Sequence, residues 1–441
     1  MVNKLLKLSI GLENVTDKDS LLNKRVDLSG FMLSTLFREG FKQLQRNVGL
    51  DINRIYEFGH TEYELENFFN IINENNFFRI FDYRVIQETF MSSLKRGNIG
   101  ASKIGVVQKL ERLTYLNTLS GLRRVTDYIA SGTKPTIERR RIHSTHYGYI
   151  CPLETPEGQG VGFKKALSMM THITFGCRGK PLIKLIKNNG LINLEDIHPT
   201  QFGNKTKVFV NGNWIGMHQN PEYLVNLLRG YRRNGLINVY TSISWQIDTN
   251  EIICLTDNGR LCNPMYIVEN NRLLIEPKHI KGISNGKIHW DDLITGFRPN
   301  KKQIDYYDCS IKDYRKEGFD TDNLLENLAH YGGIIEYIDP EELNNSMMTS
   351  TYQIDSKTSA KYTHCELHPS LIFGSTVFAL PFVQHNPGAR NTYAVSHTKQ
   401  GLTTYTSNFN NRMDPSAHLL HYPERPLLIT RLNEVINNHK I

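Results

Sequence analysis

The longest regular hydrophobic pattern lies near the N-terminus of the chain. Residues 26–48 carry apolar side chains at spacings of one, three and four, namely Met32, Leu33, Leu36, Phe37, Phe41 and Leu44. Such spacings place side chains on one stripe of a helix. The pattern therefore predicts an amphipathic helix whose apolar stripe faces the protein core and has no chemical role.

Residues 76–175 are mostly helical in pattern. Within them, residues 106–124 carry an apolar stripe and end at a pair of arginines, which predicts one helix. The sequence FKKALSMMTHI, from Phe163, predicts a further helix just after a series of glycines. Between the two, residues 125–138 form a polar loop with Gly and Pro turn signals.

The middle of the chain changes character. In residues 176–270, short runs rich in β-branched side chains alternate with NG and DNG turns. This predicts the hairpins of a small β-rich domain, and we find no catalytic set of residues in it. In residues 271–360 the sequence GGIIEYIDPEEL predicts a strand, a turn at Asp339 and Pro340, and a short helix.

The C-terminal segment contains the most apolar run, residues 370–383. This run predicts a buried strand or helix and is too short to span a bilayer. After a turn at residues 386–388, a polar helix is expected with Arg390 near its N-terminus. The helix dipole and the guanidinium would both favour an anion such as phosphate there.

The stretch from residue 139 to residue 165 combines arginines, histidines and glutamates with closely spaced prolines and glycines. Because proline and glycine interrupt regular structure, it predicts a rigid, shaped loop. Glu154 on this loop is a candidate for a polar site, and the alternative is an ion pair with residues 139–141. His143 and His146 are expected to fix the loop by hydrogen bonds rather than to bind a ligand.

Composition narrows the class of protein. A chain of 441 residues with 39% hydrophobic and 22% charged residues can form roughly two to four globular domains. The N-terminus lacks the apolar core of a signal peptide, so we expect a soluble protein. The six cysteines contain no CxxC pair, which argues against a zinc ribbon or a disulfide framework and favours a reducing compartment.

The net charge of +8 is concentrated in two segments. Residues 101–165 hold eleven Lys and Arg against five Asp and Glu, and residues 361–441 hold seven against four. Such an uneven distribution predicts contact with a polyanion, and a solvated basic surface is the alternative.

The sequence lacks the motifs of several classes of enzyme. It contains no GxxxxGK[ST] loop, no HExxH motif and no nucleophile elbow. The acidic pair Asp17 and Asp19 is expected to cap a helix, and we assign no metal ligand to this chain. Cations, shaped loops and aromatic side chains without an obvious reacting group indicate a nucleic-acid or nucleotide platform. It would either bind alone or complete the active site of another chain.

Specific motifs then point to a family. The segments VVQKLERLTYLNTLSGLRR, HSTHYGYICPLETPEGQGVGFKKALSMM and ALPFVQHNPGARNTYAVSHTKQGL follow one another in this chain. They resemble, in the same order, the second-largest subunit of multisubunit DNA-directed RNA polymerases of the eukaryotic, archaeal and large-DNA-virus type. The resemblance covers nearly the whole chain.

The resemblance implies an α+β multidomain fold. Its parts would be the C-terminal part of the protrusion (1–75), a helical fork (76–175), a β-rich first external domain (176–270), a second external domain (271–345) and the first part of the mixed hybrid-binding domain (346–441).

The chain departs from the family in two ways. Family subunits are more than twice as long, so the chain resembles a central fragment, either of a split subunit or of an interrupted gene. With a composition rich in Asn, Ile and Lys, this favours a large DNA virus, and localisation in the cytoplasm or virion, or alternatively the nucleus. The loop at residues 125–138 differs from the family sequence. Of the roles that the resemblance implies, contact of this loop with downstream DNA is therefore the one that the sequence supports least.

The resemblance also implies a mechanism. The family polymerises NTPs on a DNA template with Mg²⁺ ions held by an aspartate cluster of the largest subunit, which is a different chain. Arg390 matches an arginine that reaches the incoming triphosphate, and Tyr393 and Glu154 match residues beside the nucleotide. The nucleic-acid-binding matches are Arg123, Arg124, Arg141, Gln159, Lys399 and Gln400.

The predicted function is therefore that of one part of an RNA polymerase, active only in the assembled complex. The chain would line the active-site cleft and contact NTP, downstream DNA and the RNA–DNA hybrid. Its partners would be the largest subunit and the remaining pieces of its own subunit. The alternative is a free-standing nucleic-acid-binding or interaction protein derived from such a subunit, without a polymerase role.

Overall fold

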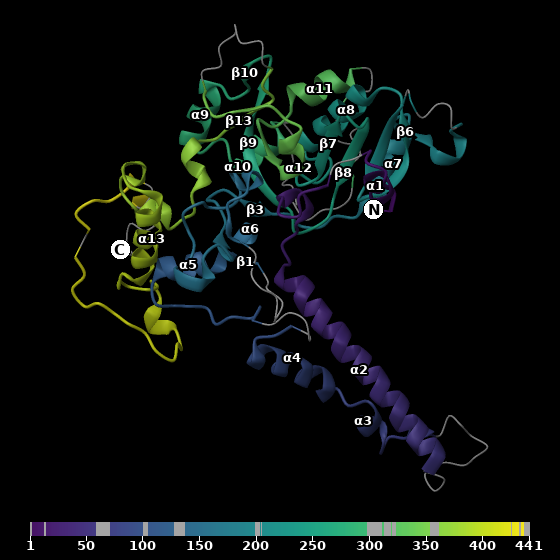
Figure 1. Ribbon diagram of the computed structural model, residues 1–441, viewed down its shortest axis with the longest axis vertical. Helices are drawn as coiled ribbons and strands as arrows, with labels where there is room; N and C mark the ends of the chain where they lie inside the picture. Colours follow the sequence, from purple (N-terminus) through teal and green to yellow (C-terminus); the bar gives the residue numbers. More distant parts are fainter. Residues whose placement is uncertain are drawn as a thin grey trace.

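The computed structural model describes residues 2–12, 15–58, 71–99, 105–127, 137–198, 203, 205–297, 311–312, 319, 323–352, 361–424, 426–431 and 434–435. Within these ranges the chain combines helices with three sheets, which confirms the α+β multidomain class. A body that holds most of the strands carries a long helical arm (Figure 1). Among the described residues, no helix is long and apolar enough to cross a membrane.

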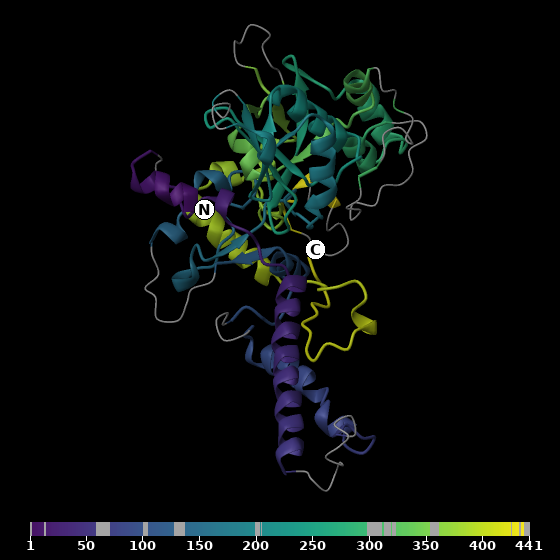
Figure 2. The ribbon, with the colours of Figure 1, turned by 90° about the vertical axis from the view of Figure 1, so that its right-hand side faces the viewer.

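The arm consists of α2 (Ser29–Phe58), with α3 (Phe77–Ile80) and α4 (Arg84–Arg96) beside it (Figures 1 and 2). The helix predicted at residues 26–48 is therefore confirmed. Gly40 allows α4 to approach, because a Cβ at this position would lie 3.3 Å from Thr89 Oγ1.

The orientation predicted for the apolar stripe of α2 is mostly wrong. Leu36 is fully buried, whereas Leu33, Phe37 and Phe41 are 44%, 50% and 43% exposed. The arm packs α3 and α4 against α2 and projects from the body (Figure 2). Side chains of α2 that do not face these two helices therefore stay at the surface.

A five-stranded sheet forms one half of the body. Its strand order is β4 (Ile192–Asn193), β6 (Asn213–His218), β5 (Thr206–Val210), β8 (Glu251–Leu255) and β7 (Ser242–Gln246). The predicted hairpin is confirmed in β5 and β6, where Asn211 and Gly212 adopt positive φ angles of 50° and 80°.

Two helices that the pattern did not predict, α7 (Gly179–Asn188) and α8 (Pro221–Arg233), pack against this sheet. They bury Ile186, Leu224 and Leu228 against strand residues such as Val208 and Ile252. The segment is therefore a sheet covered by helices rather than a set of hairpins alone.

The second half of the body is built around β9 (Leu261–Glu269). This strand pairs with β10 (Arg272–Leu273), β11 (Ile335–Ile338), β13 (His364–Glu366) and β3 (His172–Ile173), and β12 (Met348–Thr349) joins β13 in parallel. The strand and short helix predicted for GGIIEYIDPEEL are confirmed as β11 and α12 (Pro340–Asn344). The remaining helices of this half are α9 (Pro277–Ser284), α10 (Trp290–Thr295) and α11 (Leu324–His330).

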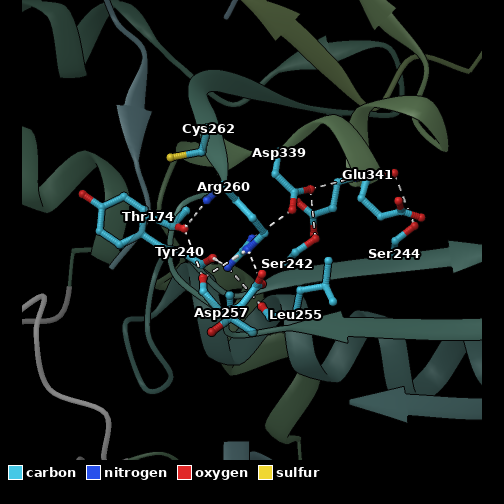
Figure 3. Close-up of polar contacts among 12 residues, drawn as sticks. Thr174, Tyr240, Ser242, Ser244, Leu255, Asp257, Arg260, Cys262, Asp339 and Glu341 are labelled. Atoms are coloured by element: carbon cyan, nitrogen blue, oxygen red, sulfur yellow. Dashed lines mark hydrogen bonds and ion pairs between the residues drawn. The ribbon is translucent and has the colours of Figure 1, made fainter. Parts of the chain in front are cut away.

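Buried ion pairs join the two halves. Arg260, beside β9, donates to the Asp339 carboxylate at 2.8 Å and to the Tyr240 carbonyl at 2.8 Å, and Ser242 of β7 donates to the same carboxylate (Figure 3). Arg232 of α8 bridges Glu336 and Glu342 at 2.7 Å each. The five ionisable side chains in these pairs are at most 3% exposed. We call this network the buried ionic junction.

Two helix predictions are wrong. Residues 106–124 are helical only in α5 (Tyr115–Leu122), because Thr114 caps the helix by accepting a hydrogen bond from the Asn117 backbone N–H at 3.1 Å. The segment from Phe163 forms β2 (Lys164–Ala166), which pairs with β1 (Arg124–Thr126), and then β3. Its backbone groups form hydrogen bonds with other chain segments rather than the bonds within one segment that a helix needs. For example, the Leu167 N–H donates to the Arg123 carbonyl at 3.0 Å.

The apolar run at residues 370–383 is also neither a strand nor an α-helix. It forms short 3₁₀ turns, Pro369–Ile372 and Val377–Ala379, with Val383–His385 following. These turns place Thr376 and Val377 in the interior and leave Phe382 56% exposed.

Candidate functional site

The predicted polar helix near the C-terminus is confirmed as α13 (Gly388–Gln400). It has one inward and one outward face. Asn391 and Val395 are buried, whereas the exposed residues of the helix's last three turns recur at spacings of three and four: Arg390, Tyr393, His397 and Gln400. This spacing places them on one stripe along the helix. We call this stripe the outward face of α13.

The N-terminus of α13 combines two sources of positive potential. Pro387 occupies the cap position, and no side chain caps the first backbone N–H groups. The guanidinium of Arg390 lies one turn away, 5.7 Å from the ring centroid of Tyr393. Uncapped N–H groups, the helix dipole and an exposed arginine together favour an anion at this end.

The inward face of α13 contacts Glu154 on the loop between Cys151 and Pro156. Glu154 is 4% exposed. Its Oε1 atom lies 2.8 Å from Lys399 Nζ and accepts hydrogen bonds from Ser120 Oγ at 2.5 Å and Thr376 Oγ1 at 3.4 Å. The alternative pairing with residues 139–141 is therefore wrong, because the carboxylate points to α13.

A second contact holds the other end of α13 to the same loop. Thr392 Oγ1 donates to the Leu153 carbonyl of this loop at 2.9 Å. The end of α13 that carries Lys399 is also held to the start of α5, where the Lys399 carbonyl accepts from Thr114 Oγ1 at 2.7 Å. Thr392 and Lys399 are seven residues apart and so lie on the same side of the helix. The loop thus runs along α13. Arg390 precedes Thr392, the residue that contacts Leu153, by two positions in the helix.

Arg123 is directed into the protein. Its Nη2 atom donates to the carbonyls of Ser168, Met169 and Thr171 at 2.6, 3.2 and 3.2 Å. Burial lowers the pKa of Arg123, and the nearby Glu154 carboxylate opposes that shift. Arg123 also occupies the C-cap position of α5. Its contact with nucleic acid stays a prediction.

A cavity of about 350 Å³ brings four predicted residues together: Arg124, Glu154, Lys399 and Gln400. Lys164 and Lys165, which were not predicted, also line it. Arg124 and Lys164 lie on one face of the β1–β2 pair, since Arg124 opposes Ala166 and Thr126 opposes Lys164. Arg390, Tyr393, Arg123 and Arg141 do not line this cavity.

The remaining predicted residues lie outside this group. Arg141 is exposed and follows α6 (Ile137–Arg140). The side chain of Gln159 and residues 128–136 of the predicted loop lie outside the described parts of the structure.

The sequence contained signals for two residues that we missed. His397 continues the spacing of Arg390 and Tyr393, so helical periodicity alone identifies it as a member of the outward face. The helix predicted from Phe163 gives no reason to place Lys164 beside Arg124. A strand assignment would have placed it on the same face as Arg124.

Hydrogen bonds fix the loop that precedes the site, as predicted for its two histidines. His143 Nδ1 lies 2.7 Å from Thr145 Oγ1, His143 Nε2 lies 2.7 Å from Asp17 Oδ2, and the His143 N–H donates to His146 Nδ1. Burial lowers the pKa of His146 to about 4. Gly162 has a φ of +79°, and a Cβ there would lie 2.4 Å from the Arg140 carbonyl oxygen, so only glycine fits.

Comparison with protein families matches three segments of the chain. Residues 108–173 match RNA polymerase Rpb2, domain 3, residues 208–269 match domain 4, and residues 377–441 match domain 6. The first match contains Glu154 and the third contains α13, so both partners of the site lie in matched segments.

Curated relatives match almost the full chain. It is 33% identical to DNA-directed RNA polymerase II subunit RPB2 of Encephalitozoon cuniculi over 99% of this chain and 35% of the relative. It is 33% identical to DNA-directed RNA polymerase II subunit 2 of Arabidopsis thaliana over 98% of this chain and 34% of the relative. It is 30% identical to DNA-directed RNA polymerase subunit Rpo2 of Sulfolobus acidocaldarius over 99% of this chain and 35% of the relative.

The chain thus spans about a third of the length of these relatives. The predicted domain boundaries, the viral source and the split of the subunit stay predictions. Over nearly its whole length, the chain is a homologue of the second-largest, Rpb2-type subunit of DNA-directed RNA polymerase, and it carries domains 3, 4 and 6 of that family.

Proposed function

We propose that this chain forms one wall of the active-site cleft of a DNA-directed RNA polymerase and acts only within the assembled enzyme. The observation that carries the proposal is the outward face of α13. It presents Arg390 and Tyr393 at an uncapped helix N-terminus, in a segment that matches Rpb2 domain 6. An exposed cation beside free backbone N–H groups suits the triphosphate of an incoming NTP.

The chemical role of Arg390 would be electrostatic. Phosphoryl transfer spreads negative charge over the phosphate oxygens in the transition state, and a positioned guanidinium stabilises that charge. Tyr393 would lie beside the nucleotide and hold the arginine by the contact between its ring and the guanidinium.

Nucleic acid would contact the neighbouring surface. Gln400 continues the outward face, and Arg124, Lys164 and Lys399 line the adjacent cavity. Cations of this kind bind phosphates irrespective of base sequence, as a polymerase requires along its hybrid and downstream DNA. Arg141, which is exposed, would extend this surface.

The Mg²⁺ ions of the reaction would belong to the largest subunit. Among the described residues no group of three or more His, Cys, Asp or Glu side chains could hold a metal ion. Glu154, the one carboxylate at the described site that contacts α13, is engaged by Lys399 and Ser120. Glu154 and its partners therefore do not fit a metal centre, and we assign no metal-dependent step of the reaction to this chain.

Substitution of Arg390 by alanine in the assembled polymerase tests the proposal. We expect kcat/KM for NTP to fall about 10²–10³-fold, the usual loss for one donor to a developing anion. Lys278→Ala is the control, because Lys278 is an exposed cation on α9 with its own partner, Glu276. If both variants elongate with unchanged NTP dependence, the proposed role of Arg390 is wrong.

Association separates the proposal from the alternative of a free-standing binder. A polymerase role requires that the chain co-purifies from its native extract with chains that supply the rest of the enzyme. A monomeric chain that binds nucleic acid in the same extract would favour the alternative.

A further inference from the structure

We propose that Glu154 is a positioning residue, and that its buried carboxylate locks α13 so that the outward face is presented in one orientation. This inference rests on the proposed function of Arg390 and assigns the same role to Ser120, Thr376 and Lys399, which contact the carboxylate. We call these four side chains the Glu154 latch.

The carboxylate of Glu154 lies at a junction of four chain segments. Lys399 comes from the end of α13, Ser120 from α5, Thr376 from the turns after β13, and Glu154 itself from the proline-rich loop. Ser120 and Thr376 are 1% and 0% exposed, and the Lys399 side chain is 15% exposed. A charge buried this deeply is stable only while its partners stay in place.

The space around the carboxylate is fitted to it. A Cβ at Gly374 would lie 2.8 Å from Glu154 Oε2 and 3.3 Å from Cys151 Cβ. The absence of a side chain at Gly374 therefore leaves room for the carboxylate at this position.

The latch acts on the helix that carries Arg390 but does not touch Arg390. Lys399 lies on the inward face with Thr392, and Arg390 lies on the outward face. Loss of the ion pair would free the end of α13 to rotate or fray, and the outward face would turn with it. A carboxylate that contacted NTP directly would instead need solvent access, and Glu154 has almost none.

A double-mutant cycle in the assembled polymerase tests this role. Glu154→Gln keeps the shape and removes the charge. We expect it to lower kcat/KM for NTP about tenfold in the native background and less than about twofold in the Arg390→Ala background, since residues that act as one unit are not additive. Equal effects in both backgrounds would overturn the positioning role.

Ser120→Ala is the milder second variant, in case Glu154→Gln does not assemble. It removes one donor to the carboxylate and should show the same non-additivity at smaller size. Asp339→Asn is the matched control, because Asp339 is also a buried, ion-paired carboxylate but belongs to the buried ionic junction. Its effect should be the same with or without Arg390.

Amide hydrogen exchange gives a readout that does not depend on the role of Arg390. In Glu154→Gln, exchange in residues 388–400 should become at least about tenfold faster, with exchange in α8 unchanged. Unchanged exchange in α13 would overturn the latch. If exchange rises while Arg390→Ala leaves NTP use unaffected, the latch stands and the proposed function fails.

Discussion

The buried ionic junction and the outward face of α13 use the same kinds of side chain in opposite ways. In the junction, Arg232 and Arg260 are at most 3% exposed and each is paired with carboxylates at 2.7–2.8 Å. On α13, Arg390 is exposed and its described contact is with the ring of Tyr393.

The difference shows where the protein can bind a ligand. The guanidinium of Arg232 is 2% exposed and already holds two carboxylates, so it is closed to a phosphate. An exposed arginine at a helix N-terminus can still direct its donors to one. The Glu154 latch combines both: a buried ion pair on one side of α13 supports an open face on the other.

The largest expected effect comes from the junction. Arg232→Met should lower the free energy of unfolding by about 3–5 kcal/mol, because the buried carboxylates of Glu336 and Glu342 lose their shared partner. Denaturant unfolding of the chain measures this. Arg390→Ala is the matched exposed substitution and should change the same quantity by no more than about 0.5 kcal/mol. Losses of similar size in the two variants would contradict the distinction between the regions.

A smaller effect is expected from pH, through His146 in the loop that leads to the site. Burial lowers its folded pKa to about 4, below its ordinary value of 6.5, so the unfolded chain binds the proton more readily. Stability from this group is present above pH 6.5 and is lost as pH falls from 6.5 towards 4.

Between pH 7 and pH 5 the loss should be on the order of 2 kcal/mol, since each pKa unit corresponds to about 1.4 kcal/mol and pH 5 lies about one and a half units below the ordinary pKa. Unfolding of the native chain and of His146→Asn, compared at pH 7 and pH 5, measures it. A variant with the same pH dependence as the native chain would remove His146 as the cause.

The smallest effect is expected from a partly exposed ion pair between two inner strands of the five-stranded sheet. Lys207 and Glu251 lie opposite each other on β5 and β8, 3.4 Å apart, with side chains 29% and 15% exposed. A double-mutant cycle should give a coupling of about 0.2–1 kcal/mol that weakens in high salt. A coupling of about 3–5 kcal/mol, as large as the loss expected for Arg232→Met, would show that burial is not what separates strong from weak pairs here.

The sequence by itself determined the local elements whose signals are short-range. Asn211 and Gly212 specified a hairpin, Asp339 and Pro340 specified a helix start, and the residues after Pro387 specified α13. The motifs around Glu154 and Arg390 also indicated the family, because they are specific in sequence whatever their structure. In each case the controlling contacts lie within a few residues of one another.

Only the tertiary structure decided the rest. The segment after Phe163 has a helical pattern but pairs with β1, because its backbone partners come from residues about forty positions earlier. The partner of Glu154 is Lys399 rather than the nearby arginines, since the loop lies along α13. Likewise, the apolar stripe of α2 stays largely exposed because the helix lies in a projecting arm. Periodicity identifies which residues share a face, and the packing of distant segments decides what that face meets.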